Sequence, residues 1–136
     1  MDAFDADVLI YAASPGHPLG LRIRALIEDQ AEVAIGSTLL LPEILIKPSR
    51  AQAGDELAAL LAVLSRLELR PLDTATAELA VGLGATYGLR ASDSAHLATA
   101  VAAGADRFIT NNTRDFRPDV AELAITYPQA LSEPPA

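Results

Sequence analysis

Short apolar runs alternate with longer segments of helical periodicity along the whole chain, and this alternation restricts the fold more than any other feature. The apolar runs have the length and bounding turn residues of strands, and the longer segments repeat Leu, Ile and Ala at helical spacing. Strands alternating with helices predict an α/β fold with a parallel sheet covered on both faces. The expected strands are residues 4–13, 31–37, 105–110 and 121–128, and the expected helices are residues 19–30, 38–50, 51–68, 74–88 and 92–104.

Length and composition set the class of protein. The 136 residues predict a single domain, which we place at residues 1–130, with a flexible tail at residues 131–136. The chain has no cysteine, its N-terminal residues do not have the pattern of a signal peptide, and no apolar run is long enough for a membrane span. We therefore expect a cytoplasmic protein.

The formal net charge of −8 argues against a protein that holds nucleic acid through bulk positive charge. It does not exclude a metal-dependent nuclease, in which clustered carboxylates form the site and bound cations reverse its charge. Several of the ten basic residues lie beside candidate acids: Lys47, Arg50, Arg90, Arg114 and Arg117.

Acidic residues occur where expected strands meet the following helix or loop. Asp5 and Asp7 lie two apart within the first strand and would share one face, Glu43 opens a helix, Asp93 lies near the start of another, and Asp115 follows the strand at residues 105–110. Each has a simpler interpretation: an exposed strand start for the first two, a helix-dipole acid for Glu43, a helix cap for Asp93 and a turn residue for Asp115.

Together these acids predict more than each does alone. The carboxyl ends of parallel strands meet at one edge of a sheet, where ligands bind near a switch in strand order. Carboxylates gathered there would repel one another unless divalent cations bridged them, and oxygen ligands without Cys or His favour Mg²⁺ or Mn²⁺. Such a site suits phosphoryl transfer with metal-activated water.

The segments "FDADVLIYA", "LLPEIL" and "LRASDSAHLATAVAAGADRFITNNTRDF" resemble the PIN-domain ribonucleases, in particular the VapC-type toxins of toxin–antitoxin pairs. The resemblance implies a three-layer α/β/α fold around a mainly parallel sheet of about four to five short strands. It also implies an acidic metal site with polar supports on the same rim. The implied site acids are Asp5, Glu43, Asp93 and Asp115, and the implied supports are Thr110 and Asn112.

The chain departs from the family pattern at two places. A hydroxyl residue and then an Asn or Ser usually follow the first Asp, whereas Ala6 and Asp7 stand here. Asp7 would either add a ligand or replace an amide at the rim. Many relatives have an acid at the position of Asn112 and others at that of Asp115, and we assign the fourth acid to Asp115.

The resemblance implies a Mg²⁺- or Mn²⁺-dependent endoribonuclease, the toxin of a type II toxin–antitoxin system, with RNA as substrate, a cognate antitoxin as partner and a homodimeric state. The early helices carry more Leu and Ile than one core-facing stripe needs, which also predicts a partner surface. His96 lies one turn after Asp93 and is interpreted as a packed helix histidine. Two alternatives remain: a PIN fold that only binds a partner protein, and a haloacid-dehalogenase-like phosphatase, which would need a later lysine than Lys47, the only one present.

Overall fold

The computed structural model describes residues 1–29 and 31–134. Strands and helices alternate along most of the chain, as the sequence predicts. The strands are β1 (Asp2–Phe4), β2 (Ala34–Ser37), β3 (Glu68–Arg70), β4 (Arg107–Ile109) and β5 (Ala124–Thr126). The helices are α1 (Ala6–Ala13), α2 (Pro18–Glu28), α3 (Leu40–Arg50), α4 (Gly54–Leu64), α5 (Thr74–Tyr87) and α6 (Ala91–Ala102), followed by the 3₁₀ turn η1 (Pro128–Ala130).

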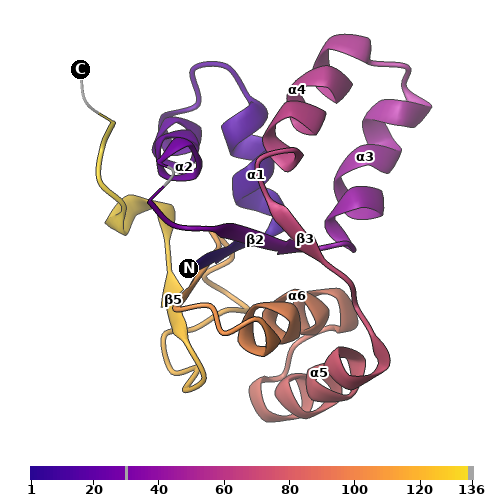
Figure 1. Ribbon diagram of the computed structural model, residues 1–136, viewed down its shortest axis with the longest axis vertical. Coiled ribbons are helices and arrows are strands. Elements are labelled where there is room, and N and C mark those ends of the chain that lie inside the picture. The colour runs from indigo at the N-terminus through magenta and orange to yellow at the C-terminus, as the bar shows by residue number, and fades with distance from the viewer. Residues whose placement is uncertain (30, 135–136) are drawn as a thin grey trace.

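The five strands form one parallel sheet in the order β3-β2-β1-β4-β5. Helices α1 to α4 lie on one face of this sheet, and α5 and α6 lie on the other (Figure 1). Each face has its own apolar core, one around Phe4, Leu9 and Ile23 and the other around Phe108, Phe116 and Leu97. The three-layer α/β/α fold with five short strands is therefore confirmed.

Local signals set most helix boundaries where the sequence predicts them. Pro42 lies in the first turn of α3, where a missing backbone N–H breaks no helical hydrogen bond. Helix α5 begins after Asp73, whose side chain accepts from the backbone N–H of Thr76, and ends at Gly88. Gly88 has a φ of 67°, a left-handed conformation that glycine adopts without a Cβ clash.

The prediction of a strand over the apolar run from Val8 to Ala13 is wrong, because this run forms α1. The first strand is only Asp2–Phe4, so Asp5 and Asp7 lie at the start of a helix rather than on one face of a strand. Both sides of α1 are apolar because α2 and α4 pack against it, and a helix buried on several sides loses its polar stripe.

Two smaller differences concern the ends of elements. β3 lies where the sequence predicts the end of one helix and the interval before the next, and it pairs with β2 at the edge of the sheet. At the C-terminus, Leu131 is buried in the core, and the guanidinium of Arg22 binds its carbonyl oxygen and the carboxylate of Glu133. The expected flexible tail is thus held against α2 as far as Glu133, and residues 135–136 lie outside the described residues.

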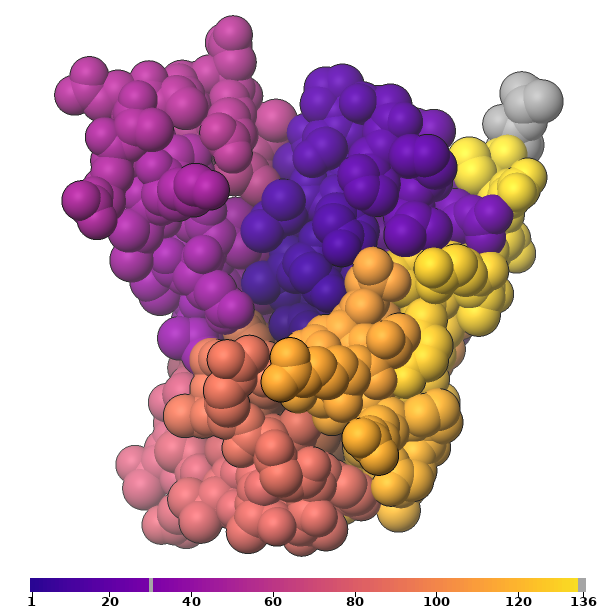
Figure 2. Space-filling view, turned by 180° about the vertical axis from the view of Figure 1, so that it is seen from behind, coloured from indigo at the N-terminus to yellow at the C-terminus, as the bar shows by residue number. Residues whose placement is uncertain are grey.

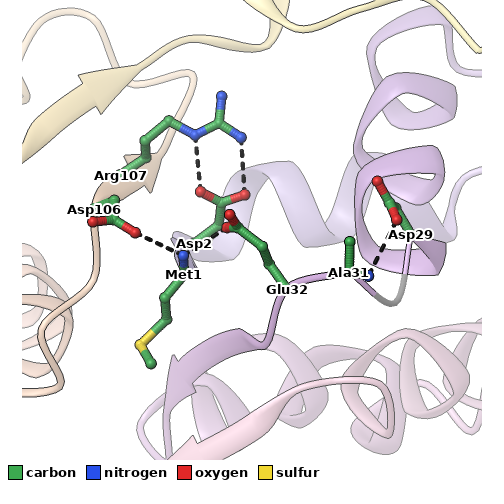
Figure 3. Close-up of polar contacts among 7 residues, drawn as sticks. All are labelled: Met1, Asp2, Asp29, Ala31, Glu32, Asp106 and Arg107. Carbon is green, nitrogen blue, oxygen red and sulfur yellow. Dashed lines mark hydrogen bonds and ion pairs between the residues drawn. The ribbon is translucent and has the colours of Figure 1, made fainter.

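An ion pair joins the neighbouring strands β1 and β4 at the amino end of the sheet. Asp2 of β1 is buried and pairs in register with Arg107 of β4, whose Nε and Nη2 donate to the carboxylate at 2.8 and 2.9 Å (Figure 3). This bidentate contact holds β1 beside β4 at the end of the sheet opposite to Asp5. A helix able to cross a membrane does not occur in the described part of the chain.

Candidate active site

The candidate site lies at the carboxyl ends of β1 and β4. The chain leaves β1 towards β2 and β3 on one side, and β4 and β5 follow on the other side, so the strand order reverses between β1 and β4. Ligands of open parallel sheets bind at such a switch point. The residues that follow these two strands are Asp5 and Thr110, both candidate site residues.

Asp5 is the N-cap of α1 and is buried at the switch point. One carboxylate oxygen accepts the backbone N–H of Ala6, and the other accepts the hydroxyl of Thr110 at 2.8 Å. Thr110 is fully buried, and its hydroxyl oxygen also accepts the backbone N–H of Asn112. Thr110 therefore orients Asp5 and shapes the loop after β4.

Asp7 joins α1 to the loop that follows β4. Its Oδ1 accepts the backbone N–H of Val8, and its Oδ2 accepts the backbone N–H of Asn111 at 3.0 Å. Both oxygens are thus used by backbone donors. Of the two roles that the sequence leaves open for Asp7, this geometry favours a rim residue that ties two elements together over an additional ligand.

Asp115 lies in the same loop and is held by Asn112. The side-chain amide of Asn112 donates to the carboxylate of Asp115 at 3.0 Å, and its oxygen accepts the backbone N–H of Asp115. The guanidinium of Arg90, at the N-cap of α6, lies 3.7 Å from Asp115 and 3.8 Å from Asp93. Asn112 supports Asp115 in this arrangement, and Arg90 bridges two of the candidate acids.

Asp93 and Glu43 reach the site from opposite faces of the sheet. Asp93 lies in the first turn of α6, and its Oδ2 is buried without a hydrogen-bond partner among the described residues. Glu43 lies in the first turn of α3 and forms a hydrogen bond with the buried ring of His96, one turn after Asp93. The interpretation of His96 as a packed histidine is therefore incomplete, because the ring also binds a candidate site acid.

The carboxylates are close enough to repel one another. Burial raises the pKa of Asp5, and Glu43 adds to the effect, while Thr110 and His96 oppose it. Burial also raises the pKa of Asp93, with further contributions from Asp5, Asp115 and Glu43. Burial and then the charge of Asp5 raise the pKa of Asp7 to about 6. Figure 2 shows the face where indigo α1, the salmon start of α6 and the orange segment after β4 meet.

A hard divalent cation fits the chemistry of these donors, although their positions do not enclose one. Carboxylate oxygens at a buried switch point are ligands that Mg²⁺ and Mn²⁺ prefer. The buried Oδ2 of Asp93 accepts no hydrogen bond from the described residues, and its nearest cationic group is the guanidinium of Arg90 at 3.8 Å. Across residues 1–29 and 31–134, however, no three His, Cys, Asp or Glu side chains are arranged to hold a metal ion. The sequence predicts an acidic metal site, and the carboxylates of the described residues do not form a preformed one.

The profile of the PIN domain family matches residues 3–121, which include every candidate site residue. The chain belongs to the PIN domain family. The candidate acids of this PIN domain come from different segments of the chain and lie at the carboxyl edge of its sheet. The comparison with curated proteins gives no match.

Solved structures with the same fold include chains of toxin–antitoxin complexes. The PIN domain is similar to a chain of a toxin–antitoxin complex from Klebsiella pneumoniae, with a TM-score of 0.75 and 22% identity over 94% of this chain and 98% of that chain. DNA-bound VapBC from Salmonella typhimurium gives a TM-score of 0.76 and 20% identity over 93% and 97% of the two chains. VapBC2 from Rickettsia felis, bound to a promoter DNA fragment, gives 0.71 and 18% over 93% and 97%.

Sequence reasoning missed two contacts at the site. The pairing of His96 with Glu43 had one local signal, the position of His96 one turn after Asp93 on the same helix. The bridging position of Arg90 had only its proximity in sequence to Asp93. Neither signal identifies a contact partner, because Glu43 and Asp115 approach from elements distant in the chain.

Proposed function

We propose that this PIN domain is a metal-dependent endoribonuclease and the toxin of a type II toxin–antitoxin pair. The observation that carries the proposal is the convergence of Asp5, Asp93, Asp115 and Glu43 at the switch point of a PIN fold, where burial and mutual repulsion raise the pKa of two of them. Repelling, desolvated carboxylates are stabilised by a bound cation, and acids with a raised pKa at a switch point are typical of a functional site.

The roles of the chain's own residues follow from their contacts. Asp5, Asp93 and Asp115, with Glu43, would hold Mg²⁺ or Mn²⁺. Thr110 orients Asp5, Asn112 orients Asp115, and Asp7 fixes α1 against the loop after β4. A bound cation would polarise the phosphodiester and activate water for its hydrolysis.

Two macromolecular partners belong to the proposal. The similar structures include chains of toxin–antitoxin complexes, which supports a cognate antitoxin for this protein. We further propose RNA as the substrate, a homodimer as the free state and the cytoplasm as the location. An antitoxin would approach the acidic site with a basic side chain, because a cation there neutralises the carboxylates and competes with metal.

The test compares two site variants with a distant control. Asp5→Asn and Asp93→Asn should each lower the rate of single-stranded RNA cleavage at least about 100-fold, because each removes a charged oxygen ligand. Asp55→Asn, in the first turn of α4, should cleave at the wild-type rate. The measurement is the initial rate on a labelled RNA in Mg²⁺, in Mn²⁺ and in EDTA. Full activity in EDTA, or in either site variant, would contradict the proposal.

A second function is favoured by one observation, the lack of a preformed metal-holding group among the described residues. On this alternative, the PIN fold binds a partner protein without catalysis. The two functions differ in whether the protein takes up Mn²⁺ and whether Asp5→Asn abolishes that uptake. Calorimetric titration of the EDTA-stripped protein with MnCl₂ distinguishes them. A protein that only binds a partner should show no heat of Mn²⁺ binding that Asp5→Asn abolishes.

A further inference from the structure

A buried histidine forms the only hydrogen bond that the described residues make to the side chain of Glu43. His96 is 2% exposed, and its Nε2 lies 2.5 Å from Oε2 of Glu43. The side chain of Glu43 is 35% exposed. The contact also joins the two outer layers of the fold, because α3 and α6 cover opposite faces of the sheet (Figure 1).

The polar contacts of the ring distinguish it from an ordinary core histidine. A core histidine usually satisfies both ring nitrogens, whereas Nδ1 of His96 is buried and has no hydrogen-bond partner among the described residues. The ring therefore makes its one hydrogen bond to Glu43. A ring with a proton on Nε2 donates Nε2–H to the carboxylate of Glu43, which is the one polar contact that the described residues give it.

The packing of His96 makes it a rigid donor for a mobile acceptor. All residues of α6 from Asp93 to Ala100 are buried, so the ring is held by its surroundings on every side. Glu43 has a long side chain at the surface and would otherwise sample several rotamers. The hydrogen bond selects a rotamer in which Glu43 is near enough to raise the pKa of both Asp5 and Asp93.

We propose that His96 is a positioning residue, whose Nε2–H holds the carboxylate of Glu43 towards Asp5 and Asp93 so that it can take part in binding a divalent cation. The inference rests on the proposed function, because it assigns a role within the same site. Hydrogen bonds to ligating groups fix their orientation, and their loss typically lowers metal affinity 10- to 100-fold.

The experiment measures Mn²⁺ affinity without RNA, by calorimetric titration of stripped protein, with thermal unfolding as a check on folding. His96→Leu removes the donor and should weaken Mn²⁺ binding by about 10- to 100-fold. His96→Gln keeps an N–H donor on a side chain of similar reach and should restore most of the affinity. The matched control is Thr99→Val, since Thr99 is buried on the same helix and, among the described residues, its hydroxyl binds only the Ala95 carbonyl oxygen.

A double-mutant comparison separates positioning from general damage to the site. In a Glu43→Gln background, His96→Leu should cause little further loss, because the carboxylate that His96 holds is already gone. An equal loss in both backgrounds, or a His96→Leu variant with wild-type affinity, would overturn the proposal. So would a His96→Gln variant as impaired as His96→Leu, or a Thr99→Val variant with the same loss.

The inference and the proposed function fail in different ways. A wild-type protein that binds Mn²⁺ but cleaves no RNA contradicts the nuclease function, while the affinities of the His96 variants still decide the positioning role. Conversely, loss of cleavage in Asp5→Asn together with normal Mn²⁺ binding in His96→Leu would overturn the positioning role alone. A wild-type protein that binds no Mn²⁺ overturns both.

Discussion

Asp7 is a carboxylate whose ionisation opposes folding. Burial, followed by the charge of Asp5, raises its pKa from 3.8 to about 6. Between these two values the folded chain holds a proton that the unfolded chain releases. The contribution of Asp7 to the free energy of unfolding is therefore fully present below the lower value and is lost as the pH rises through about 6.

Replacing Asp7 by Asn should remove this dependence on pH. Asp7→Asn buries no charge, but its single amide oxygen can accept only one of the two backbone N–H groups that bind Asp7. In EDTA, the free energy of unfolding of Asp7→Asn relative to wild type should therefore rise by about 1 kcal/mol between about pH 5 and about pH 7.5, because only the wild-type side chain loses a proton over this range. Urea unfolding at both pH values measures it, and a difference that does not change with pH would contradict the assignment.

At the scale of elements, the site depends on how closely α2 packs against α1. A Cβ atom added at Gly20 of α2 would lie 2.0 Å from the carbonyl oxygen of Tyr11 in α1, a contact that only backbone movement relieves. Gly82 of α5 offers a contrast, because a Cβ there would meet nothing within 4 Å. The same substitution at these two positions therefore isolates the effect of close helix packing.

We expect Gly20→Ala to lower the free energy of unfolding by about 2 kcal/mol or more, since overpacking forces the two backbones apart. Gly82→Ala should raise it by about 0.5–1 kcal/mol, because alanine is the better residue inside an exposed helix. Denaturant unfolding of both variants provides the measurement. Similar changes in the two variants would show that α1 and α2 are not in this contact.

At the scale of the whole molecule, the charge is unevenly distributed. The chain carries a net charge of −8, yet Arg114 and Arg117 line a groove of about 360 Å³ that also contains Asp115. Neither arginine has an ion-pair partner within residues 1–29 and 31–134. On the proposed function, a groove with two guanidinium groups beside Asp115 would receive phosphates of the RNA substrate.

We therefore expect Arg114→Ala combined with Arg117→Ala to weaken the binding of a labelled single-stranded RNA, measured by fluorescence anisotropy in an inactive Asp5→Asn background. The slope of log affinity against log salt should fall by about 1.4, because each lost phosphate contact contributes about 0.7. Arg50→Ala combined with Arg66→Ala removes equal charge from other surfaces and serves as the control. Identical slopes for the two double variants would indicate only a general effect of charge.

Exposed apolar side chains concentrate on the face formed by α1 to α4. Ile46 of α3 is 55% exposed, and the other exposed large apolar residues of these four helices are Ile10, Leu21, Leu41 and Leu61. Apolar surface of this kind marks a contact for another chain. The excess apolar composition of the early helices is thus explained in part by side chains that remain outside the core.

We expect the purified protein to self-associate through this face, and Ile46→Glu to shift it towards monomer by placing a charge in the contact. Val81→Glu is the control, because Val81 is 73% exposed on α5 in the opposite layer. Sedimentation or light scattering across concentration measures the mass. A strict monomer at high micromolar concentration would contradict the dimer. The absence of a complex after co-expression with the gene next to the one that encodes this chain would contradict the antitoxin.

The sequence by itself determined the α/β class and most helix boundaries, because those signals are local. Helical periodicity predicts α2, α4 and α5, a proline marks the first turn of α3 and a glycine ends α5, whatever lies elsewhere in the chain. It also identified the acids that follow strands, since parallel strands place their carboxyl ends at one edge. The order in which those strands pair has no such local signal.

Only the tertiary structure decided the state of Val8–Ala13 and the contacts within the site. A short apolar run has no polar face that reveals its period, so the sequence alone does not distinguish a strand from a helix here. The run forms a helix that α2 and α4 cover. Asp5 and Thr110 are 105 residues apart, and Glu43 and His96 are 53 apart. The first hydrogen bond forms because β1 pairs with β4, and the second because α3 and α6 start at the same edge of the sheet. Contacts between residues so far apart in the chain are set by tertiary packing rather than by local sequence.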